Sequence, residues 1–304
     1  MQDNENTGRV ERPDDVAQPA SKTPAPSADT APAQATPTRE WRRALPKWAL
    51  WLSLGVLLWF ALAAFGPKFG LIDWRTGLGF MIRDAGVILL GLSAIFAVIA
   101  FLFAFFKTPR GPWWKAALAF VIPAVLFMGL LTMRAQAEGV PPIHDVSTDL
   151  RNPPTFSAET MALRSSLDAN PVNNYGTPLG ELEMWAGSDD AALKVKNHAD
   201  LIAENFPDLQ PIVVGNVTTE QALDAIVAAM GEIGLQDVRR VEGTDTVEGV
   251  AETFAFGFKD DVVARVADGQ IDLRSVSRVG VSDLGYNAER VKDLREAIED
   301  RLGR

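Results

Sequence analysis

Three long apolar runs dominate the first half of the chain. They cover residues 48–65, 86–106 and 116–133, and none of them contains a charged residue. At about 1.5 Å of rise per helical residue, each run can cross a hydrocarbon core of about 30 Å, the two shorter ones narrowly. An apolar segment in lipid satisfies its backbone groups only as a helix. The pattern therefore predicts three transmembrane helices within a membrane region of residues 40–133.

The first run has a second interpretation, as a cleaved secretory signal that ends near Ala61–Ala63. The long polar leader before the run and the two further runs after it favour a membrane span. The leader itself, residues 1–39, is rich in Pro, Ala, Thr and Ser and lacks hydrophobic periodicity. Such a segment cannot bury enough apolar surface to fold, so we predict a disordered polar tail.

Residues 134–187 separate the last apolar run from the next periodic pattern. Pro141, Pro142, Pro153 and Pro154 interrupt the first half of this stretch, and residues 161–187 are polar and rich in Gly, Asn and Pro. Prolines disfavour a helix at the residues before them. We therefore interpret residues 134–187 as an extended tether that leads to a soluble domain of residues 188–304.

The soluble region alternates between helical and strand-like patterns. Three helices are predicted. The first covers 189–205, the second runs from a capping box of Thr218 and Gln221 to Gly234, and the third covers 287–302. Strands are predicted at 211–214, 238–241, 250–258, 262–266 and 271–278, with one aromatic face formed by Phe254, Phe256 and Phe258. This order indicates an α+β fold in which an antiparallel sheet packs against helices in two layers.

Basic residues are distributed unevenly around the three runs. Three lie in residues 42–47 and three in the loop 107–115, whereas the loop 66–85 mixes three basic residues with two acidic ones. By the positive-inside rule, this predicts a cytoplasmic N-terminus, and three crossings then put residues 134–304 outside. Tryptophans that suit interfacial anchoring flank the runs, at Trp41, Trp48, Trp74, Trp113 and Trp114.

The charge balance limits the partners of the soluble region. Residues 134–304 carry a net charge of −14, against −10 for the whole chain. So acidic a region is repelled by phosphate backbones, which argues against nucleic-acid binding, and by anionic lipid headgroups. The lipid bilayer remains a predicted partner through the three spans, and another envelope protein or a small anion is a further candidate.

Residue types exclude several kinds of site. The chain has no cysteine, so thiol nucleophiles, iron–sulfur clusters and cysteine zinc sites are excluded. A metal set of His144, Asp145 and Asp149 is conceivable, but the only other histidine is His198, and two histidines are too few for a closed zinc site. Phosphate-binding loops, dinucleotide fingerprints and serine-hydrolase elbows are missing. We predict no metal and no cofactor.

Several segments of the soluble region together resemble a known family. They read VPPIHDVSTDLRNPPTF from Val140, FPDLQPI from Phe206, DDVVARV from Asp260 and IDLRSVSRVGVSDLGYNAERV from Ile271. They resemble the family called domain of unknown function 1499, over about residues 140–302. Members often have Trp where this chain has Leu235, which changes a packing contact. The resemblance implies an uncharacterised bacterial inner-membrane protein and supplies no catalytic residue.

The candidate site is a dense group of polar residues near the C-terminus. It consists of Asp260, Asp261, Arg274, Ser275, Ser277, Arg278, Ser282, Asp283, Asn287 and Arg290. In a binding interpretation, Arg274, Arg278 and Arg290 converge on an anion, and Ser275, Ser277 and Asn287 donate hydrogen bonds to it.

A structural interpretation of the same residues stays open. In it, Asp260 and Asp261 pair with Arg274 or Arg278 across neighbouring strands, and Asp283 or Ser282 caps the final helix. Both interpretations need Arg274 and Arg278 on one face of a strand, with Ser275 and Ser277 on the other. Because adjacent strand residues face opposite sides, Asp260 and Asp261 are not expected to act as paired carboxylates, and we expect them to be solvated at the start of a strand.

The sequence thus predicts an integral inner-membrane protein that presents a periplasmic binding or scaffold domain. The alternative is a hydrolase that acts on an anionic substrate of the cell envelope, with an aspartate base beside a co-facial arginine. The question of catalysis stays open, because the chain holds no recognisable catalytic constellation.

Overall fold

The computed structural model of the chain describes residues 37–108 and 110–304. The predicted disordered tail lies outside these residues, except for residues 37–39, which begin the first helix. Residues 41–304 form one compact unit. The contacts reported below all lie within that unit.

Among the described residues, three helical segments are long and apolar enough to cross a membrane. They are Arg43–Phe65, Thr76–Phe106 and Trp113–Gly139. The first lies in α1 (Pro37–Phe65), the second joins the π-helix η1 (Thr76–Asp84) to α2 (Ala85–Phe106), and the third is α3 (Trp113–Gly139). The three predicted spans are therefore helical, and the second helix begins ten residues before its apolar run.

Small residues allow the three helices to approach one another closely. Ala49 of α1, Ala97 and Ala100 of α2, and Ala116 and Ala119 of α3 form one buried cluster. Beside it, the Ser53 hydroxyl is hydrogen-bonded to that of Ser93 at 2.9 Å and donates to the Ala119 carbonyl at 2.6 Å. Small side chains and hydroxyl hydrogen bonds are the usual means of helix association in lipid.

A six-stranded antiparallel sheet organises the rest of the chain. The strands are β1 (Asp145–Ser147), β2 (Ile212–Val213), β3 (Gln236–Arg240), β4 (Thr246–Glu252), β5 (Lys259–Ala267) and β6 (Gln270–Ser277). Their order is β1-β6-β5-β4-β3, and β2 also pairs with β6. The predicted α+β class is confirmed.

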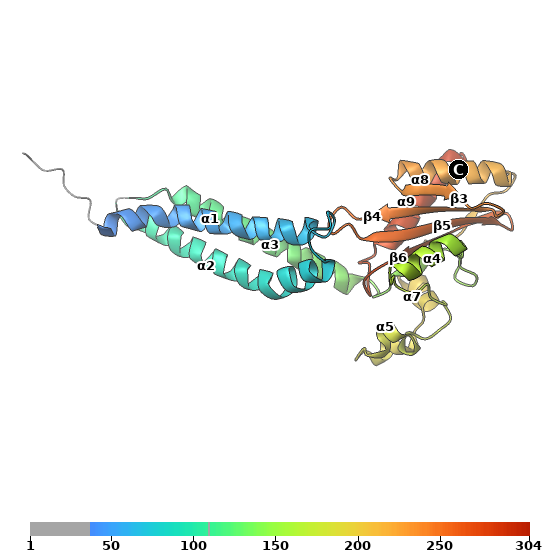
Figure 1. Cartoon of the computed structure of the whole chain (residues 1–304), viewed down its shortest axis with the longest axis horizontal. Helices are drawn as coiled ribbons and strands as arrows, with labels where there is room; N and C mark the ends of the chain where they lie inside the picture. The colour runs from blue at the N-terminus through green and yellow to red at the C-terminus, as the bar shows by residue number, and fades with distance from the viewer. Residues whose placement is uncertain (1–36, 109) are drawn as a thin grey trace, which may run out of the picture. The chain divides into compact units, whose positions relative to one another are not determined.

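Two helices cover one face of this sheet, which we call the α9 face. They are α8 (Thr219–Glu232) and α9 (Tyr286–Arg301), and Figure 1 shows them on the same side of the strands. The main hydrophobic core lies in this layer and includes Ile226, Met230, Leu273, Leu294 and Ile298, all fully buried.

The other face, which we call the α4 face, carries the helix α4 (Ala158–Ser166). Phe156, just before α4, packs there on Val263 and Val276. The strand register aligns Val250 of β4 with Asp261 of β5, and Asp261 with Val276 of β6. Charged and apolar side chains are therefore neighbours on this face.

The predicted tether over residues 134–187 is wrong. Helix α3 continues to Gly139, and Ile143 is already part of the main core at 1% exposure. Strand β1, helix α4, the 3-10 helix η2 (Leu179–Glu181) and α5 (Glu183–Ala186) follow. The prolines end helices here without making the chain extended, because side chains such as Trp185 are buried against the domain.

Two smaller predictions are also corrected. The helix expected over 189–205 is two helices, α6 (Ala191–Val195) and α7 (His198–Asn205), each with its own N-cap, Asp190 and Asn197. The aromatic strand expected over 250–258 ends at Glu252. Phe256 and Gly257 have φ of 65° and 64°, so residues 253–258 turn instead of continuing the strand.

Candidate functional site

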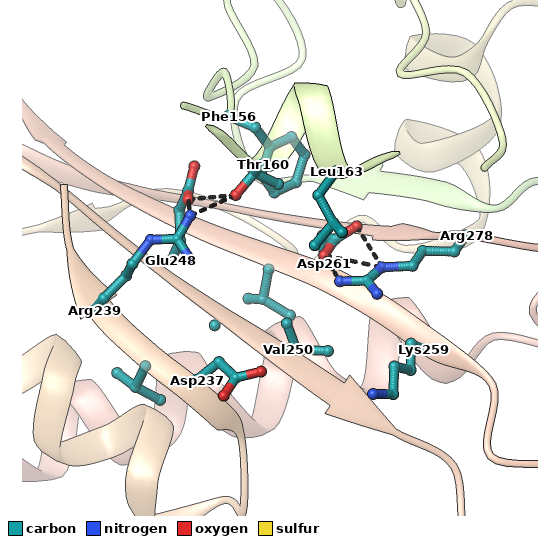
Figure 2. Close-up of a pocket in the computed structure, with 13 residues that line it drawn as sticks. Phe156, Thr160, Leu163, Asp237, Arg239, Glu248, Val250, Lys259, Asp261 and Arg278 are labelled. Carbon is teal, nitrogen blue, oxygen red and sulfur yellow. Dashed lines mark hydrogen bonds and ion pairs between the residues drawn. The ribbon is translucent and has the colours of Figure 1, made fainter. Parts of the chain in front are cut away.

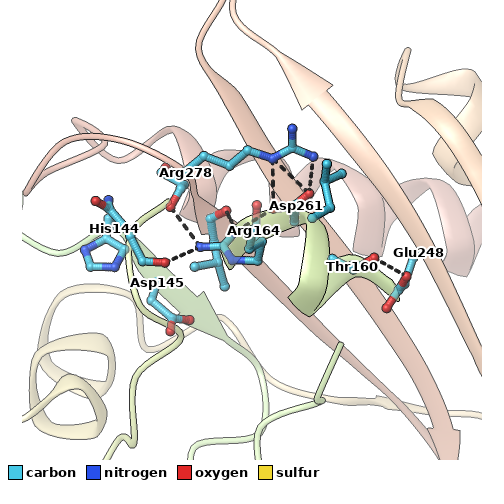
Figure 3. A network of polar contacts seen from close by, with 12 residues as sticks. His144, Asp145, Thr160, Arg164, Glu248, Asp261 and Arg278 are labelled. Carbon is cyan, nitrogen blue, oxygen red and sulfur yellow. Dashed lines mark hydrogen bonds and ion pairs between the residues drawn. The ribbon is translucent and has the colours of Figure 1, made fainter. Parts of the chain in front are cut away.

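A buried carboxylate, Asp261, joins helix α4 to the last strand. Both Asp261 oxygens accept from Arg278, whose Nε lies 3.0 Å from Oδ2 and whose Nη2 lies 2.6 Å from Oδ1. Arg164, in the last turn of α4, donates to the same carboxylate from the other side, as Figure 3 shows. Asp261 is only 1% exposed, so two guanidinium groups share one buried carboxylate.

Arg164 binds more than this carboxylate. Its Nη2 donates to the carbonyl of Asn170 at 2.6 Å, and its two Nη atoms reach the carbonyls of Val276 and Ser277 at 3.3 Å. These bonds fix the C-terminal end of α4 over β6.

A second buried carboxylate, Glu248 of β4, holds the other end of α4. It accepts from the Ser157 backbone at 2.5 Å, the Ser157 hydroxyl at 2.9 Å and the Thr160 hydroxyl at 2.6 Å. Arg239 of β3 adds an ion pair at 2.8 Å. Ser157 is also the N-cap of α4. Helix α4 is thus fixed to the sheet at both ends by charge-assisted hydrogen bonds.

A groove of about 550 Å³ lies between α4 and strands β3–β5. Figure 2 shows Arg239, Glu248, Asp261, Lys259 and Arg278 among the side chains that line it. Phe156, Leu163 and Val250 form its apolar wall. The cations that line it are Arg239, Lys259 and Arg278. Asp237, at a bulge in β3, faces the same space.

The cations of the groove differ in what they bind. Arg278 and Arg239 are both paired with buried carboxylates. Lys259 is exposed, and within the described part of the chain no hydrogen bond or ion pair reaches its ammonium group. An ammonium group without a protein partner at the edge of a groove can bind an anion.

A separate buried network surrounds Asp145 of β1. Arg274 donates to it from Nε at 2.9 Å and from Nη2 at 2.7 Å, and the Tyr175 hydroxyl donates at 2.7 Å. Burial works to raise the pKa of the Asp145 carboxyl, but the charge and hydrogen bonds of Arg274 outweigh it and hold the pKa below its ordinary value. Burial and the neighbouring Asp145 raise the pKa of Tyr175 well above its ordinary value. The Arg274 guanidinium group is therefore bound to the Asp145 carboxylate in the interior of the protein.

Both histidines lie beside this network. The side-chain amide of Asn173 is 3.4 Å from Nε2 of His144 and 3.3 Å from Nε2 of His198. Burial lowers the pKa of His144 and lowers that of His198 to about 4, in each case against the attraction of Asp145. Both rings are therefore neutral at neutral pH and fully buried, and His144 belongs to the folded domain instead of the predicted tether.

The remaining candidate residues lie on the α9 face. Arg290 pairs with Asp260 at 2.8 Å and donates to Ser275 at 3.0 Å and to Asn287 at 2.6 Å. Asn287 in turn donates to the Ser277 hydroxyl at 2.9 Å. The Asp260, Ser275, Ser277 and Asn287 side chains are buried, so this network joins α9 to the sheet.

Asp283 and Ser282 organise the turn before α9. Asp283 accepts from the backbone of Gly285 at 2.9 Å and of Asn287 at 2.7 Å, while Ser282 accepts from the backbone of Leu284 at 3.2 Å. Burial raises the pKa of Asp283 to about 6, despite those two backbone donors. The N-cap position of α9 is Gly285, so Asp283 lies two residues before it, but its carboxylate accepts from the Asn287 amide in the first turn of the helix.

The ten candidate residues therefore do not form one site. The predicted faces of β6 are observed, and the predicted Asp261–Arg278 pair exists. The convergence of Arg274, Arg278 and Arg290 on one anion is wrong, because Arg290 lies on the opposite face and Arg274 is bound to Asp145. The expected solvation of Asp260 and Asp261 is also wrong, since both are buried.

Sequence reasoning missed the residues that complete the groove. They are Glu248, Arg239 and Lys259, which line the groove, and Arg164, which does not line it but binds the lining residue Asp261. The sequence holds a signal for Arg164, because Ser157 followed by Glu159 and Thr160 is typical of the start of a helix, here α4, which carries Arg164. This signal lies inside the stretch interpreted as a tether. The described residues contain no group of three or more His, Asp or Glu placed to hold a metal.

The similarity to known proteins is confined to a family of unknown function. A family model described as "Protein of unknown function (DUF1499)" matches residues 145–298, just over half of the chain. Searches of curated proteins and of solved structures find no match. The matched residues run from β1 through α4 and the sheet into α9, and so include both sides of the groove. The chain belongs to the DUF1499 family.

Proposed function

We propose that this membrane protein resides in the bacterial inner membrane and presents its DUF1499 domain to the periplasm as a binding domain for an anionic ligand. The location is supported by three apolar helices and by the basic residues in 42–47 and 107–115, which favour the cytoplasm. The ligand site is the groove between α4 and strands β3–β5.

One observation carries the binding proposal: Lys259 offers, beside Arg278 at the same groove, an ammonium group that pairs with none of the residues in 37–108 and 110–304. Arg278 Nε and Nη2 are bound to Asp261, and none of the residues described by the structure forms a hydrogen bond with its Nη1. A carboxylate, sulfate or phosphate that lies between Lys259 and Arg278 gains charge-assisted hydrogen bonds. Phe156 and Leu163 supply an apolar wall for the rest of the ligand.

The lining also limits which anions fit. Asp237 and the buried pairs around Asp261 and Glu248 keep the groove from being strongly positive. A polyanion is therefore a poor ligand. A compact anion with an apolar portion, and with a hydrogen-bond donor for Asp237, matches the lining better.

The hydrolase alternative is less well supported. Asp261 does lie beside a co-facial arginine, as that alternative requires. However, both of its oxygens accept from Arg278, and Oδ2 accepts from Arg164 as well. A general base needs an oxygen that can reach the substrate or a water. Asp261 instead positions the arginines, which favours binding over hydrolysis.

The binding proposal is tested with a defined anionic probe. The full chain in nanodiscs of zwitterionic phosphatidylcholine is titrated with anilinonaphthalene sulfonate, and empty nanodiscs give the background. We expect saturable binding that Lys259→Ala weakens by about tenfold, the value of one charge-assisted hydrogen bond. The control is Lys292→Ala, which removes the same charge from an exposed position of α9. Equal affinities for the two variants, or no signal above background, would overturn the proposal.

A further inference from the structure

The connection between β4 and β5 is an aromatic loop, residues 253–258, with the sequence TFAFGF. Thr253 closes the loop, because its backbone donates to the Phe258 carbonyl at 2.9 Å and its hydroxyl accepts from the Phe258 backbone at 2.9 Å. Phe256 adopts φ of 65°, a conformation that is a true outlier for a bulky residue. Such a residue persists only where its surroundings hold it.

The surroundings that hold this loop are the end of the first membrane helix. The Phe256 backbone donates to the carbonyl of Ala64, in the last turn of α1, at 2.6 Å. Lys68 forms an ion pair with Glu252 at 3.1 Å and reaches the carbonyl of Phe254 at 3.4 Å. The Phe65 and Phe254 rings meet edge to face at 5.4 Å.

Close backbone contact adds to this docking. A Cβ on Gly257 would lie 2.9 Å from the Cα of Lys68, so only glycine fits there. On the other side of the loop, the Trp74 and Phe258 rings meet edge to face at 5.7 Å. The loop is therefore shaped to the α1–η1 connection, residues 66–75.

The outer side of this assembly is apolar and uncovered by any described residue. Phe254 is 81% exposed, Phe69 is 70% exposed and Leu71 is 68% exposed. Phe69 and Leu71 follow the apolar end of α1 at Phe65 and the next basic residue, Lys68, and Phe254 contacts the Phe65 ring. They are therefore continuous with the lipid-facing surface of α1, at the depth where the hydrocarbon core gives way to headgroups.

The chain connection independently keeps the domain at the membrane. Only Val140, Pro141 and Pro142 lie between the end of α3 at Gly139 and the buried core residue Ile143. The four residue steps from Gly139 to Ile143 span at most about 14 Å, so the domain cannot move far from the end of its last span.

We propose that the loop 253–258, together with Phe69 and Leu71, lies in the lipid interface of the leaflet on the domain's side, with the Phe254 ring inserted. Lipid is the occupant that the surface favours, because the patch continues a lipid-facing helix. Lys68 and Arg75 lie beside the patch, and Arg75 stacks on Trp74, as is common for interfacial anchors. This proposal is independent of the ligand of the groove.

The absence of cysteine gives a clean test. Phe254→Cys is the only thiol of its variant and can carry a nitrobenzoxadiazole probe. The full chain is reconstituted in phosphatidylcholine vesicles with and without doxyl-labelled lipid. We expect blue-shifted emission that doxyl lipid lowers by about twofold or more, because interfacial side chains lie at headgroup and upper acyl depth.

Two labelled controls bracket this result. Leu71→Cys should behave like Phe254→Cys, while Val213→Cys, at a 65% exposed position on β2, should show neither blue shift nor quenching. A probe at 254 that emits like the one at 213 would overturn the proposal. So would a blue shift without doxyl quenching, since that outcome indicates a covering protein.

Because a probe could itself drive insertion, a second measurement uses the unlabelled wild type. Hydrogen exchange of the peptide 253–258 should be slower in vesicles than in detergent-free amphipol, while a peptide from α9 exchanges equally in both. Equal exchange of the loop in the two media would contradict the proposal.

Discussion

Asp260 and Asp261 are neighbours in β5, yet their carboxylates bind arginines on opposite faces of the sheet. Asp260 pairs with Arg290 of α9 at 2.8 Å, and Asp261 pairs with Arg278 at 2.6 Å and with Arg164 of α4. The two-residue period of a strand produces this separation. One dipeptide therefore joins the sheet to a helix on each side.

The first prediction concerns the independence of the two networks. Double-mutant cycles with Asp260→Asn should give a coupling free energy of about 1–3 kcal/mol with Arg290→Gln, because these residues are in contact. The same substitution should couple to Arg278→Gln by less than about 0.5 kcal/mol. Pulse proteolysis of the full chain in urea measures the stability of each variant. Strong coupling between Asp260 and Arg278 would show that the ten polar residues do act as one unit.

The second prediction is that Asp261→Ala destabilises the domain severely. The substitution leaves the buried Arg164 and Arg278 guanidinium groups without a counter-charge, which typically costs about 3–5 kcal/mol. Asp293→Ala, at an exposed position of α9, should change stability by less than about 0.5 kcal/mol. If the midpoints of unfolding in urea agree for the two variants, Asp261 does not hold α4 to the sheet.

Local patterns were sufficient to predict part of this fold. The Thr218–Gln221 capping box is present, with both reciprocal hydrogen bonds, because all of its atoms lie within four residues. The faces of β6 also follow from sequence, since alternation is a local property. Likewise, an uninterrupted apolar run is sufficient to identify a membrane helix.

Other parts depend on partners that are distant in sequence. Arg164 looks like a surface residue of a short helix until Asp261, 97 positions away, is placed beside it. From sequence, Arg274 is a candidate either to bind an anion or to pair with Asp260 or Asp261 within the C-terminal hairpin, but its carboxylate is Asp145, 129 positions away. The apolar alternation at Phe254–Phe258 resembles a strand, and only the docking of Phe256 on Ala64 reveals a turn.

A third prediction tests how α4 is positioned over the groove. Glu248→Ala removes the acceptor of the Ser157 and Thr160 groups at the start of α4. We expect amide exchange across α4 to accelerate by about tenfold or more, since each lost charged hydrogen bond is worth about 1.5–3 kcal/mol. Hydrogen exchange with mass spectrometry measures this, and α9 should be unaffected. The matched control is Glu252→Ala, the other glutamate on the same face of β4, which is paired with Lys68 instead.

The result also connects α4 to ligand binding. Because Phe156 and Leu163 line the groove, loosening α4 should weaken the binding of anilinonaphthalene sulfonate. Rapid exchange of α4 with unchanged probe affinity would show that the probe binds elsewhere.

The last prediction concerns pH, where two buried groups act in opposite directions. The folded-state pKa of His198 is lowered to about 4, so the unfolded chain binds this proton more readily, and stability falls as pH drops from 6.5 to 4. The folded-state pKa of Asp283 is raised to about 6, so the folded chain binds this proton more readily, and stability rises as pH drops from 6 toward 4. Each effect amounts to about 3 kcal/mol at most, so the two largely offset each other in the wild type.

Single substitutions separate these opposing effects. Asp283→Asn should lose stability more steeply than the wild type between pH 6 and pH 4, because the contribution of His198 is no longer offset. His198→Phe keeps an aromatic ring against Tyr175 and Trp185 and should lose stability less steeply. Other titrating groups, such as His144, are common to all three proteins and cancel in the differences. Urea midpoints at pH 7, 6, 5 and 4 measure the slopes. Parallel curves for the three proteins would mean that neither group is perturbed by its burial, since the sign of each slope follows from the direction of its pKa shift.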